Sequence, residues 1–536
     1  MKELTGAGKL VRLILRRDRW LLPIWVLVLG LIPISYVASF EELFPTAAAR
    51  QAYAGASGHN GAFVVLYGPL YGSSLAELVA WRAGFLPIVI GLFSILTVIR
   101  HTRTEEEAGR RELLGSTVVG RHAGLAAALV TVFFANLVLG VLLAAGVIGQ
   151  GLPAGGSWAF GLGFAAAGWV YAAVAAVAAQ LTSGAGSARG IAIGVLGATY
   201  VFRVAGDLSG LSDARALEWA SWLSPIGWAH RVRAYAGETW WPLALAAVAA
   251  ALLVAASVVL SARRDIGAGL LPPRLGPASA GPWLRSPLAL AWRLHRTLLA
   301  GWVAGILALG LIMGYLGAGI GDLVRDNREL RDVFLRLGGV NGLVDSYFAG
   351  TLGLFGLMAA GYSIQATLRL REEEAAGRAE PVLSTAIGKV RWAAGHLAFS
   401  LLGPAVVLAV AGLAMGLTHG LNTGDIGREL PRILAGAMVQ LPAVWVLGAV
   451  AVLLFGLLPR FAAVSWGALV LCLLFGLVGP ALRLDQWLLD ISPFTHLPKL
   501  PGGEMSPAPL LWLAAIALAL AAAGLAALRR RDVPGV

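Results

Sequence analysis

Long uninterrupted apolar runs constrain the fold of this 536-residue chain more than any other feature. Each run holds about 20 residues, the length at which an α-helix crosses the hydrocarbon core of a bilayer. Only 13% of the residues are charged, whereas a soluble protein has roughly a quarter. The runs are continuous and do not alternate, which excludes a transmembrane β-barrel. The sequence therefore predicts an all-α polytopic membrane protein that folds in lipid.

We place 12 spans, six in each half of the sequence, so both termini lie on one side of the membrane. If that side is the cytoplasm, its segments hold 27 Lys and Arg against 12 Asp and Glu, a net +15, and the other side has a net −3. This distribution follows the positive-inside rule and predicts a bacterial cell membrane protein with cytoplasmic termini. It also explains the overall charge of +12 without nucleic-acid binding. The spans are 20–40, 78–99, 122–148, 158–181, 187–204 and 240–262, then 297–320, 347–368, 392–417, 432–458, 461–482 and 508–528.

The residues before the first span are basic and amphipathic. Leu10, Val11 and Ile14 alternate with Arg12 and Arg16 at helical spacing. This pattern favours an interfacial helix under the first span. A basic flank without regular structure is the alternative.

Several kinds of chemistry have no residues to support them. The single cysteine, Cys472, lies in an apolar run, and the eight histidines are scattered, so we expect no disulfide and no metal site. No G-x-x-x-x-G-K-[ST] loop is present to hold a nucleotide phosphate. We therefore expect no catalytic residue and no cofactor in this protein, and an energy source on a separate subunit.

The two halves of the sequence repeat each other at a shift of 268 residues. Segments 104–121 and 372–389 then align without gaps, and nine of their 18 pairs are identical. A shift of 267 pairs 263–265 with 530–532. Parallel repeats of this kind pack around an axis along the membrane normal, with a pathway between them. We predict six-helix units at 1–264 and 291–536, joined by a Pro- and Gly-rich linker at 265–290.

Three glycine pairs have the spacing that permits close contact between helices. They are Gly190 and Gly194, Gly310 and Gly314, and Gly412 and Gly416. Because the protein has 69 glycines, such spacings also arise by chance, and they indicate packing without locating a site.

The best-matched part of the repeat is a charged segment between the second and third span of each unit. In the first unit, Thr104 and Glu107 have the spacing of a capping box that starts a helix at Glu105. Glu106 and Arg110 have i,i+4 spacing in the favoured order. We predict a short cytoplasmic surface helix here, and a solvated charged loop is the alternative.

The second unit repeats this segment with one difference. Glu374 and Arg378 repeat the i,i+4 pair, but Pro381 stands where the first unit has Leu113. A proline disfavours helical backbone at the residue before it, so we expect this helix to stop or kink at Glu380. A charged helix presented twice is typical of a docking surface for a twofold partner.

The two segments resemble the coupling-helix segment of ABC-2 type transporter permeases. The fused, double-length sequence is similar to the actinobacterial exporters of polyketide and ionophore antibiotics, the tetronasin type. The resemblance includes the Ser-Pro steps at 224–225 and 492–493, between the fifth and sixth span of each unit. Family members usually have Thr-Pro at the end of the coupling segment, where this sequence has Thr117-Val118 and Thr385-Ala386.

The resemblance implies that each segment seats in a groove of a separate nucleotide-binding ATPase subunit. Two ATPase copies, which bring ATP and Mg²⁺, would then serve one permease. The residues expected to contact the two copies are Glu105, Glu106, Gly109, Arg110 and Glu112 in the first unit, and Glu373, Glu374, Gly377, Arg378 and Glu380 in the second.

A second candidate region lies at the outer ends of the spans. Glu77 and Asp345 are paired by the repeat and are candidates for an outer gate, although such residues more often cap a helix or pair with an arginine such as Arg82. Trp219, Trp222 and Trp487 would anchor at headgroup depth or form part of a lid. They lie in charged amphipathic stretches, at 213–223 and 483–491, which we expect to fold as short helices; a third such stretch is 325–337.

The function that these observations favour is the permease subunit of an ATP-driven exporter of amphipathic and hydrophobic compounds. The alternative is a proton-coupled secondary multidrug antiporter, which usually has ionisable residues at mid-membrane; the predicted spans have none. A membrane scaffold or sensor is a third class, but the large outer domain of a sensor is missing.

Overall fold

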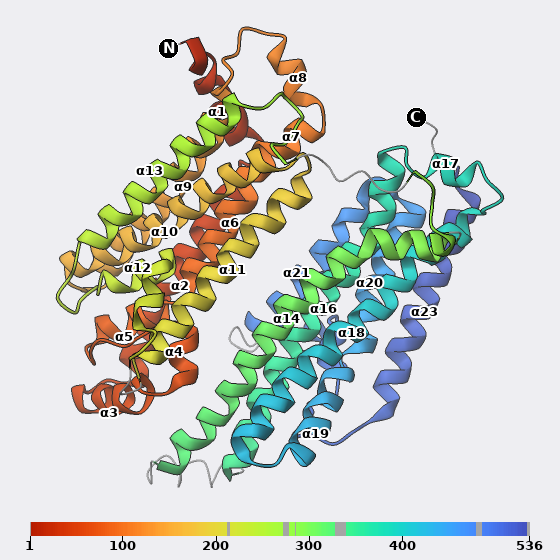
Figure 1. Ribbon diagram of the computed structural model, residues 1–536. Helices are drawn as coiled ribbons and strands as arrows, with labels where there is room; N and C mark the ends of the chain where they lie inside the picture. The colour runs from red at the N-terminus through yellow and green to blue at the C-terminus, as the bar shows by residue number, and fades with distance from the viewer. Residues whose placement is uncertain are drawn as a thin grey trace. The chain divides into compact units, whose positions relative to one another are not determined.

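The computed structural model describes residues 2–211, 215–271, 278–284, 286–326, 339–478 and 485–532. It divides the protein into two compact units, Met1–Gly276 and Pro277–Val536 (Figure 1). Within the described ranges the regular elements are helical, and 12 of the helices are long and apolar enough to cross a membrane, six in each unit. The predicted all-α polytopic fold is confirmed.

Unit 1 begins with short elements that precede its first long helix. They are the 3₁₀ turn η1 (Lys2–Leu4) and the amphipathic helix α1 (Ala7–Arg17). The apolar residues Leu10, Val11 and Ile14 of α1 pack on Ala127 and Ala128 of α9. The helix predicted at the N-terminus is therefore present, and part of its apolar face is covered by protein.

The remaining elements of unit 1 form a helical bundle with short helices at both ends. They are α2 (Leu21–Leu43), α3 (Ala47–Gly58), α4 (Gly61–Tyr67), α5 (Leu75–Arg82), α6 (Leu86–His101), α7 (Arg103–Glu107), α8 (Arg110–Gly115), α9 (Ala123–Gly149), α10 (Ala154–Leu181), α11 (Ala185–Ser209), η2 (Glu218–Leu223), α12 (Pro225–Arg231) and α13 (Trp241–Ala262). Helices α1, α7 and α8 lie at one end of the unit, and α3, α4 and α5 lie at the other (Figure 1).

Helix α10 forms the centre of unit 1. In its most apolar stretch 78% of the residues are buried, the highest share among the candidate spans, and it packs against α6, α9 and α13. Small residues permit this, because a Cβ atom at Gly140 of α9 would lie 2.6 Å from the carbonyl oxygen of Gly161 in α10. Lipid tails are as apolar as the helix surfaces, so the hydrophobic effect does not drive transmembrane helices together. Close packing of this kind holds them together instead.

Unit 2 has a similar series of long helices. Its elements are η3 (Pro282–Leu284), α14 (Pro287–Asp326), α16 (Gly339–Ala375), α17 (Glu380–Leu383), α18 (Lys389–Thr423), α19 (Ile426–Met438), α20 (Leu441–Leu457), η4 (Pro459–Val464), α21 (Ser465–Val478), α22 (Gln486–Leu489), η5 (Pro493–His496) and α23 (Pro507–Arg530). Helix α17 lies at the end of the unit that holds the last turn of α23, and α19 lies at the opposite end (Figure 1).

The predicted spans differ from the helices in several places. Helices α14, α16 and α18 extend beyond the spans 297–320, 347–368 and 392–417 at both ends. The span 78–99 is divided into α5 and α6 around Ala83, and the span 432–458 is divided into α19 and α20 around Gln440. The span 187–204 ends too early, because α11 continues to Ser209. Parts of the outer stretches, at 212–214, 327–338 and 479–484, fall outside the described residues, while η2 and α22 are the short helices that the described parts form.

Two of the three glycine pairs lie at helix contacts. A Cβ atom at Gly416 of α18 would lie 2.8 Å from the Cα atom of Leu430 in α19, and Gly310 of α14 faces Ala414 of α18 at 2.9 Å. A Cβ atom at Gly190 or Gly194 would meet nothing within 4 Å. The same glycine spacing therefore marks close helix contacts in unit 2 but not in unit 1.

Replacing these glycines with alanine tests that difference. Gly416→Ala forces α18 and α19 apart and should lower the free energy of unfolding by about 1–3 kcal/mol, the usual cost of overpacking. Gly190→Ala should leave stability unchanged or raise it by up to about 1 kcal/mol, since alanine is the better helix former. Thermal unfolding of the detergent-purified protein, followed by tryptophan fluorescence, measures both. Equal effects of the two substitutions would contradict the assigned packing.

Candidate functional site

The charged segment of unit 1 forms two short helices joined at a glycine. Helix α7 (Arg103–Glu107) ends at Ala108, Gly109 has φ of 69°, and α8 (Arg110–Gly115) follows. A positive φ is readily adopted only by glycine. The predicted single helix that starts at Glu105 is therefore wrong, since the backbone turns at Gly109.

The capping box predicted at the start of this helix is also absent. The hydroxyl of Thr104 donates to the carbonyl oxygen of Ile99 at 3.2 Å. The carboxylate of Glu107 accepts from the backbone N–H of Ala185 at 2.9 Å, at the start of α11. Glu107 therefore satisfies a free N–H group at the N-terminus of another helix.

Unit 2 repeats the same backbone turn. Helix α16 ends at Ala375, Gly377 has φ of 68°, and α17 begins at Glu380. Pro381 occupies the first turn of α17, where its missing N–H has no intrahelical partner to lose. The expectation that Pro381 would stop a helix at Glu380 is wrong, because a helix starts there instead.

The turn changes which charges pair. Arg110 Nε lies 2.7 Å from Glu105 Oε2, and Arg378 Nε lies 2.9 Å from Glu373 Oε2. The predicted pairs of Arg110 with Glu106 and of Arg378 with Glu374 are not formed. The left-handed glycine shifts the arginine by one residue relative to a continuous helix, so that the i,i+5 carboxylate faces it in both units.

The second glutamate that the two segments share pairs with the end of the last span in its unit. Glu106 lies 2.9 Å from Arg264 Nη2, directly after α13. Glu374 accepts two bonds from the guanidinium of Arg531, at 2.8 and 2.7 Å, directly after α23. The charged segment and the residues after the last span are two separate matches of the repeat. The same ion pair therefore joins them in both units.

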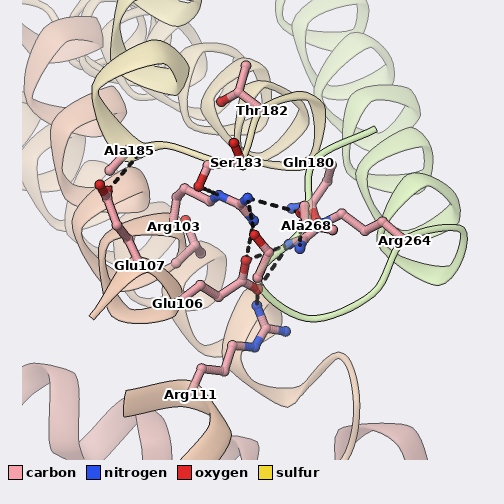
Figure 2. Close-up of polar contacts among 12 residues, drawn as sticks. Arg103, Glu106, Glu107, Arg111, Gln180, Thr182, Ser183, Ala185, Arg264 and Ala268 are labelled. Carbon is pink, nitrogen blue, oxygen red and sulfur yellow. Dashed lines mark hydrogen bonds and ion pairs between the residues drawn. The ribbon is translucent and has the colours of Figure 1, made fainter. Parts of the chain in front are cut away.

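In unit 1 this ion pair belongs to a buried cluster (Figure 2). Arg103, Arg111 and Arg264 all contact the carboxylate of Glu106. Arg103 is fully buried and donates to the carbonyl oxygens of Ser183, at 3.0 Å, and Ala268, at 2.9 Å. The cluster therefore ties α7 to the loops that follow α10 and α13.

The surroundings of the cluster perturb one of its cations. Burial lowers the pKa of Arg111, Glu106 opposes this shift, and the nearby charge of Arg264 adds to it. One carboxylate faces three guanidinium groups, so the cluster has more positive than negative charge.

The structure divides the predicted ATPase-contacting residues into a buried set and an exposed set. The side chains of Glu106, Glu373 and Glu374 are 1%, 7% and 9% exposed and take part in ion pairs inside their units. Those of Arg110 and Arg378 are 49% and 54% exposed. Glu112, Glu380 and the apolar residues Leu113 and Val118 are exposed as well, whereas Glu105, Gly109 and Gly377 are intermediate.

The two candidate outer-gate acids have different surroundings. Glu77 and Ser74 form a capping box at the start of α5, so the simpler alternative holds for Glu77. Arg82, its proposed partner, lies over the ring of Tyr67 at 4.6 Å. Asp345 pairs with Arg432 of α19.

Asp345 also lines a large cavity within unit 2. The cavity has a volume of about 1030 Å³ and lies between α16, α21 and the residues around η5. Tyr347, Leu354, Phe494 and Gln440 are among its lining residues. Its size and mixture of apolar and polar walls suit a drug-sized molecule.

The candidate tryptophans are placed in two ways. Trp219 and Trp487 are 60% and 67% exposed. Trp222 stacks on Trp241 at 4.8 Å, and the guanidinium of Arg231 lies 4.6 Å from its ring. Two of the three indoles therefore remain available for the membrane interface.

Two polar groups were not found from the sequence. Arg203 and Asp207, both buried in α11, form an i,i+4 pair, and Arg203 donates to the carbonyl oxygen of Val64 at 2.8 Å. Extending the predicted fifth span from residue 204 to residue 209 would have placed both residues of this pair in one helix. His295 and His396 are buried with ring nitrogens 3.0 Å apart, and 101 residues of separation left no signal.

The fold defines a polytopic α-helical membrane protein whose two units share a charged segment fixed to the last span. Residues 284–529 match the family model described as the C-terminal domain of the multidrug efflux system permease Rv1217c. The sequence is 45% identical over 531 residues to the multidrug efflux system permease protein Rv1217c of Mycobacterium tuberculosis (strain ATCC 25618 / H37Rv), covering 99% of this protein and 95% of the relative. The protein therefore belongs to this family of multidrug efflux permeases.

Breaking the ion pair to the last span tests its structural role. Arg531→Gln leaves Glu374 in a largely buried position without a cation, and we expect the free energy of unfolding to fall by about 2–3 kcal/mol. Arg530→Gln removes the same charge from an exposed neighbour and should change it by less than about 0.5 kcal/mol. Arg264→Gln and Arg263→Gln form the comparison in unit 1, where the loss should be smaller because Glu106 keeps Arg103 and Arg111 as partners. Thermal unfolding measures all four, and indistinguishable members within a pair would show that the ion pair does not stabilise its unit.

Proposed function

We propose that this protein is the permease subunit of an ATP-driven ABC exporter of the ABC-2 type. The observation that supports it best is the charged segment, which both units present with the same glycine turn and the same two ion pairs. A duplicated surface of this kind suits two copies of one partner. The related protein is named as part of an efflux system, and a system implies further components.

The proposed partner is a separate ATPase subunit, present in two copies. It would supply the nucleotide site and Mg²⁺, because this sequence has no phosphate-binding loop. The permease would therefore not be an enzyme by itself. Arg110, Glu112 and Leu113 in unit 1 form the exposed docking surface, and Arg378, Glu380 and Pro381 form the one in unit 2.

The buried glutamates would act as positioning residues in this mechanism. A displacement of α7 and α8 by the partner would reach α13 through the pair of Glu106 and Arg264. A displacement of the α16–α17 turn would reach α23 through the pair of Glu374 and Arg531. Rigid elements joined by buried ion pairs transmit such movements, and the two units would alternate between inward- and outward-open states.

The proposed cargo is an amphipathic or hydrophobic compound, such as an antibiotic or another drug. The cavity beside Asp345 in unit 2 is the candidate place for it, because its walls combine aromatic and aliphatic residues with a few polar groups. The resemblance to tetronasin-type exporters is consistent with such a cargo. The outward direction is the one that the name of the relative gives for that protein.

A proton-coupled antiporter is the second candidate, and the pair of Arg203 and Asp207 favours it. Both residues lie within a candidate span and are buried, where an ionisable group is costly and usually functional. Asp207 nevertheless lies between Arg203 and Arg231, at 3.5 and 3.8 Å. A carboxylate paired with two arginines suits a fixed structural ion pair better than a proton carrier.

Charge reversal on the exposed arginines tests the docking surface. Arg110→Glu combined with Arg378→Glu should abolish co-purification of an ATPase with the tagged permease, while the permease still inserts in the membrane. Arg428→Glu with Arg460→Glu changes the charge equally at exposed positions outside the segment and should leave co-purification intact. Mass spectrometry of the captured complex measures the ATPase. Full ATPase binding by the Arg110 and Arg378 variant would overturn the proposed surface.

The energy source separates the two candidate functions. In cells loaded with a fluorescent amphipathic dye, we expect efflux to stop when ATP is depleted and to persist when a protonophore collapses the proton gradient. Asp207→Asn should then leave the energy dependence unchanged. Efflux that survives ATP depletion, and that stops with the protonophore, would establish the antiporter instead.

A further inference from the structure

A cavity of about 560 Å³ lies in unit 1 under the N-terminal helix α1. Its walls come from α1, from the end of α6 with α7 and α8, from the start of α9 and from the residues after α13. These elements lie at the end of unit 1 that the Lys and Arg distribution predicts to face the cytoplasm. The proposed ATPase surface, at Arg110 and Glu112, does not include the cavity walls.

Cations dominate the polar part of this cavity. Arg17, Arg111, Arg121 and Arg264 line it, against two carboxylates, Glu105 and Asp265. The buried Glu106 behind the wall is shared by three arginines, Arg111 and Arg264 among them. The group therefore carries excess positive charge in a partly buried place, where charge is costly unless an anion neutralises it.

Arg121 shows this excess most directly. One of its nitrogens, Nη2, donates to the carbonyl oxygens of Ser261, Ala262 and Arg264, at 3.1, 3.1 and 3.0 Å. Among the residues that the structure describes, no carboxylate pairs with it. Backbone carbonyl groups thus hold its guanidinium in place, and its positive charge is available to an anionic ligand.

Apart from His101, which pairs with Asp18, most of the remaining wall is apolar. Leu10, Leu13 and Ile14 of α1 line one wall, and Val119 and Ile266 line others. Leu13 and Ile266 are 52% and 53% exposed, although both are aliphatic. Exposed apolar residues beside a cationic pocket are a feature of surfaces that contact lipid.

The adjoining helices extend this apolar surface away from the cavity. Helix α9 exposes Val130 and Phe134, and α13 exposes Leu252 and Val259. Both helices are candidate spans, so these side chains face the hydrocarbon region of a bilayer.

We propose that this cavity binds an anionic phospholipid, whose phosphate meets Arg17, Arg111, Arg121 and Arg264 while an acyl tail lies against Leu13 and Ile266. A free phosphate would satisfy the cations but leave the apolar wall in contact with water. Basic pockets between spans on the cytoplasmic side select anionic headgroups for the same reason. A lipid here contacts both α1 and the charged segment, so it stabilises the position of the segment against α1.

The test uses the full-length protein in nanodiscs of 30% phosphatidylglycerol and 70% phosphatidylcholine, followed by native mass spectrometry of retained lipids. Arg17→Gln with Arg121→Gln removes two charge-assisted hydrogen bonds to the phosphate and should lower retention of phosphatidylglycerol at least about tenfold. The matched control is Arg16→Gln with Arg263→Gln. Arg16 is the neighbour of Arg17 in α1, and Arg263 lies among the residues whose carbonyl groups accept from Arg121; both are exposed and do not line the cavity.

A second variant fills the cavity without removing charge. Gly124 lines the cavity, and a Cβ atom there would meet only Arg111 Nε, at 4.0 Å. Gly124→Leu therefore suits helix α9 and projects a side chain into the space. It should lower phosphatidylglycerol retention about tenfold while the thermal unfolding midpoint without added lipid stays the same.

Three outcomes would overturn the proposal. Retention of phosphatidylglycerol and phosphatidylcholine by the unaltered protein in the same ratio as in the nanodisc would show that the cavity does not select an anionic lipid. Equal losses in the control variant would assign the effect to general surface charge. Inorganic phosphate that raises the thermal midpoint as much as phosphatidylglycerol vesicles, with phosphatidylcholine vesicles as reference, would identify a free anion as the ligand.

Discussion

The pairing of a buried glutamate with an arginine at the end of the last span is the interaction on which each unit of this permease depends. Glu106 with Arg264, and Glu374 with Arg531, join the turn after one long helix to the end of another that is about 160 residues further along the sequence. A charge is tolerated in such a place only with a partner. Glu374 has Arg531, and Glu106 has Arg264 together with Arg103 and Arg111. The paired glutamates Glu105 and Glu373 then orient the exposed arginines.

This arrangement separates two roles within a segment that the sequence presents as uniformly charged. The buried carboxylates fix the segment to the transmembrane helices, and the exposed Arg110 and Arg378 belong to the surface proposed to dock the ATPase. A partner that binds the exposed arginines can move the transmembrane helices only if the segment is also fixed to those helices by the buried ion pairs. The two surfaces are not identical, because unit 1 exposes Leu113 where unit 2 exposes Pro381.

The units also differ beyond the shared segment. Asp345 lines a large cavity and pairs with Arg432, while its repeat partner Glu77 caps a short helix. Unit 1 has α1 and the cationic cavity beneath it. Fusing two units into one polypeptide lets each acquire its own substitutions, so cargo contact and lipid contact need not be shared equally between them.

The sequence by itself determined the solvent, the fold class, the number of spans and the duplicated segment. Span length and charge depend on local composition, and a gap-free match between Glu105 and Glu373 needs no structure to be seen. Only the tertiary structure decided which charges pair. A glycine with φ of 69° moved the partner of Arg110 from Glu106 to Glu105, and contacts over long sequence separations brought Arg264 to Glu106 and His295 to His396. Helical spacing predicts neighbours within a continuous helix, but pairing across a turn or between helices depends on how the helices pack.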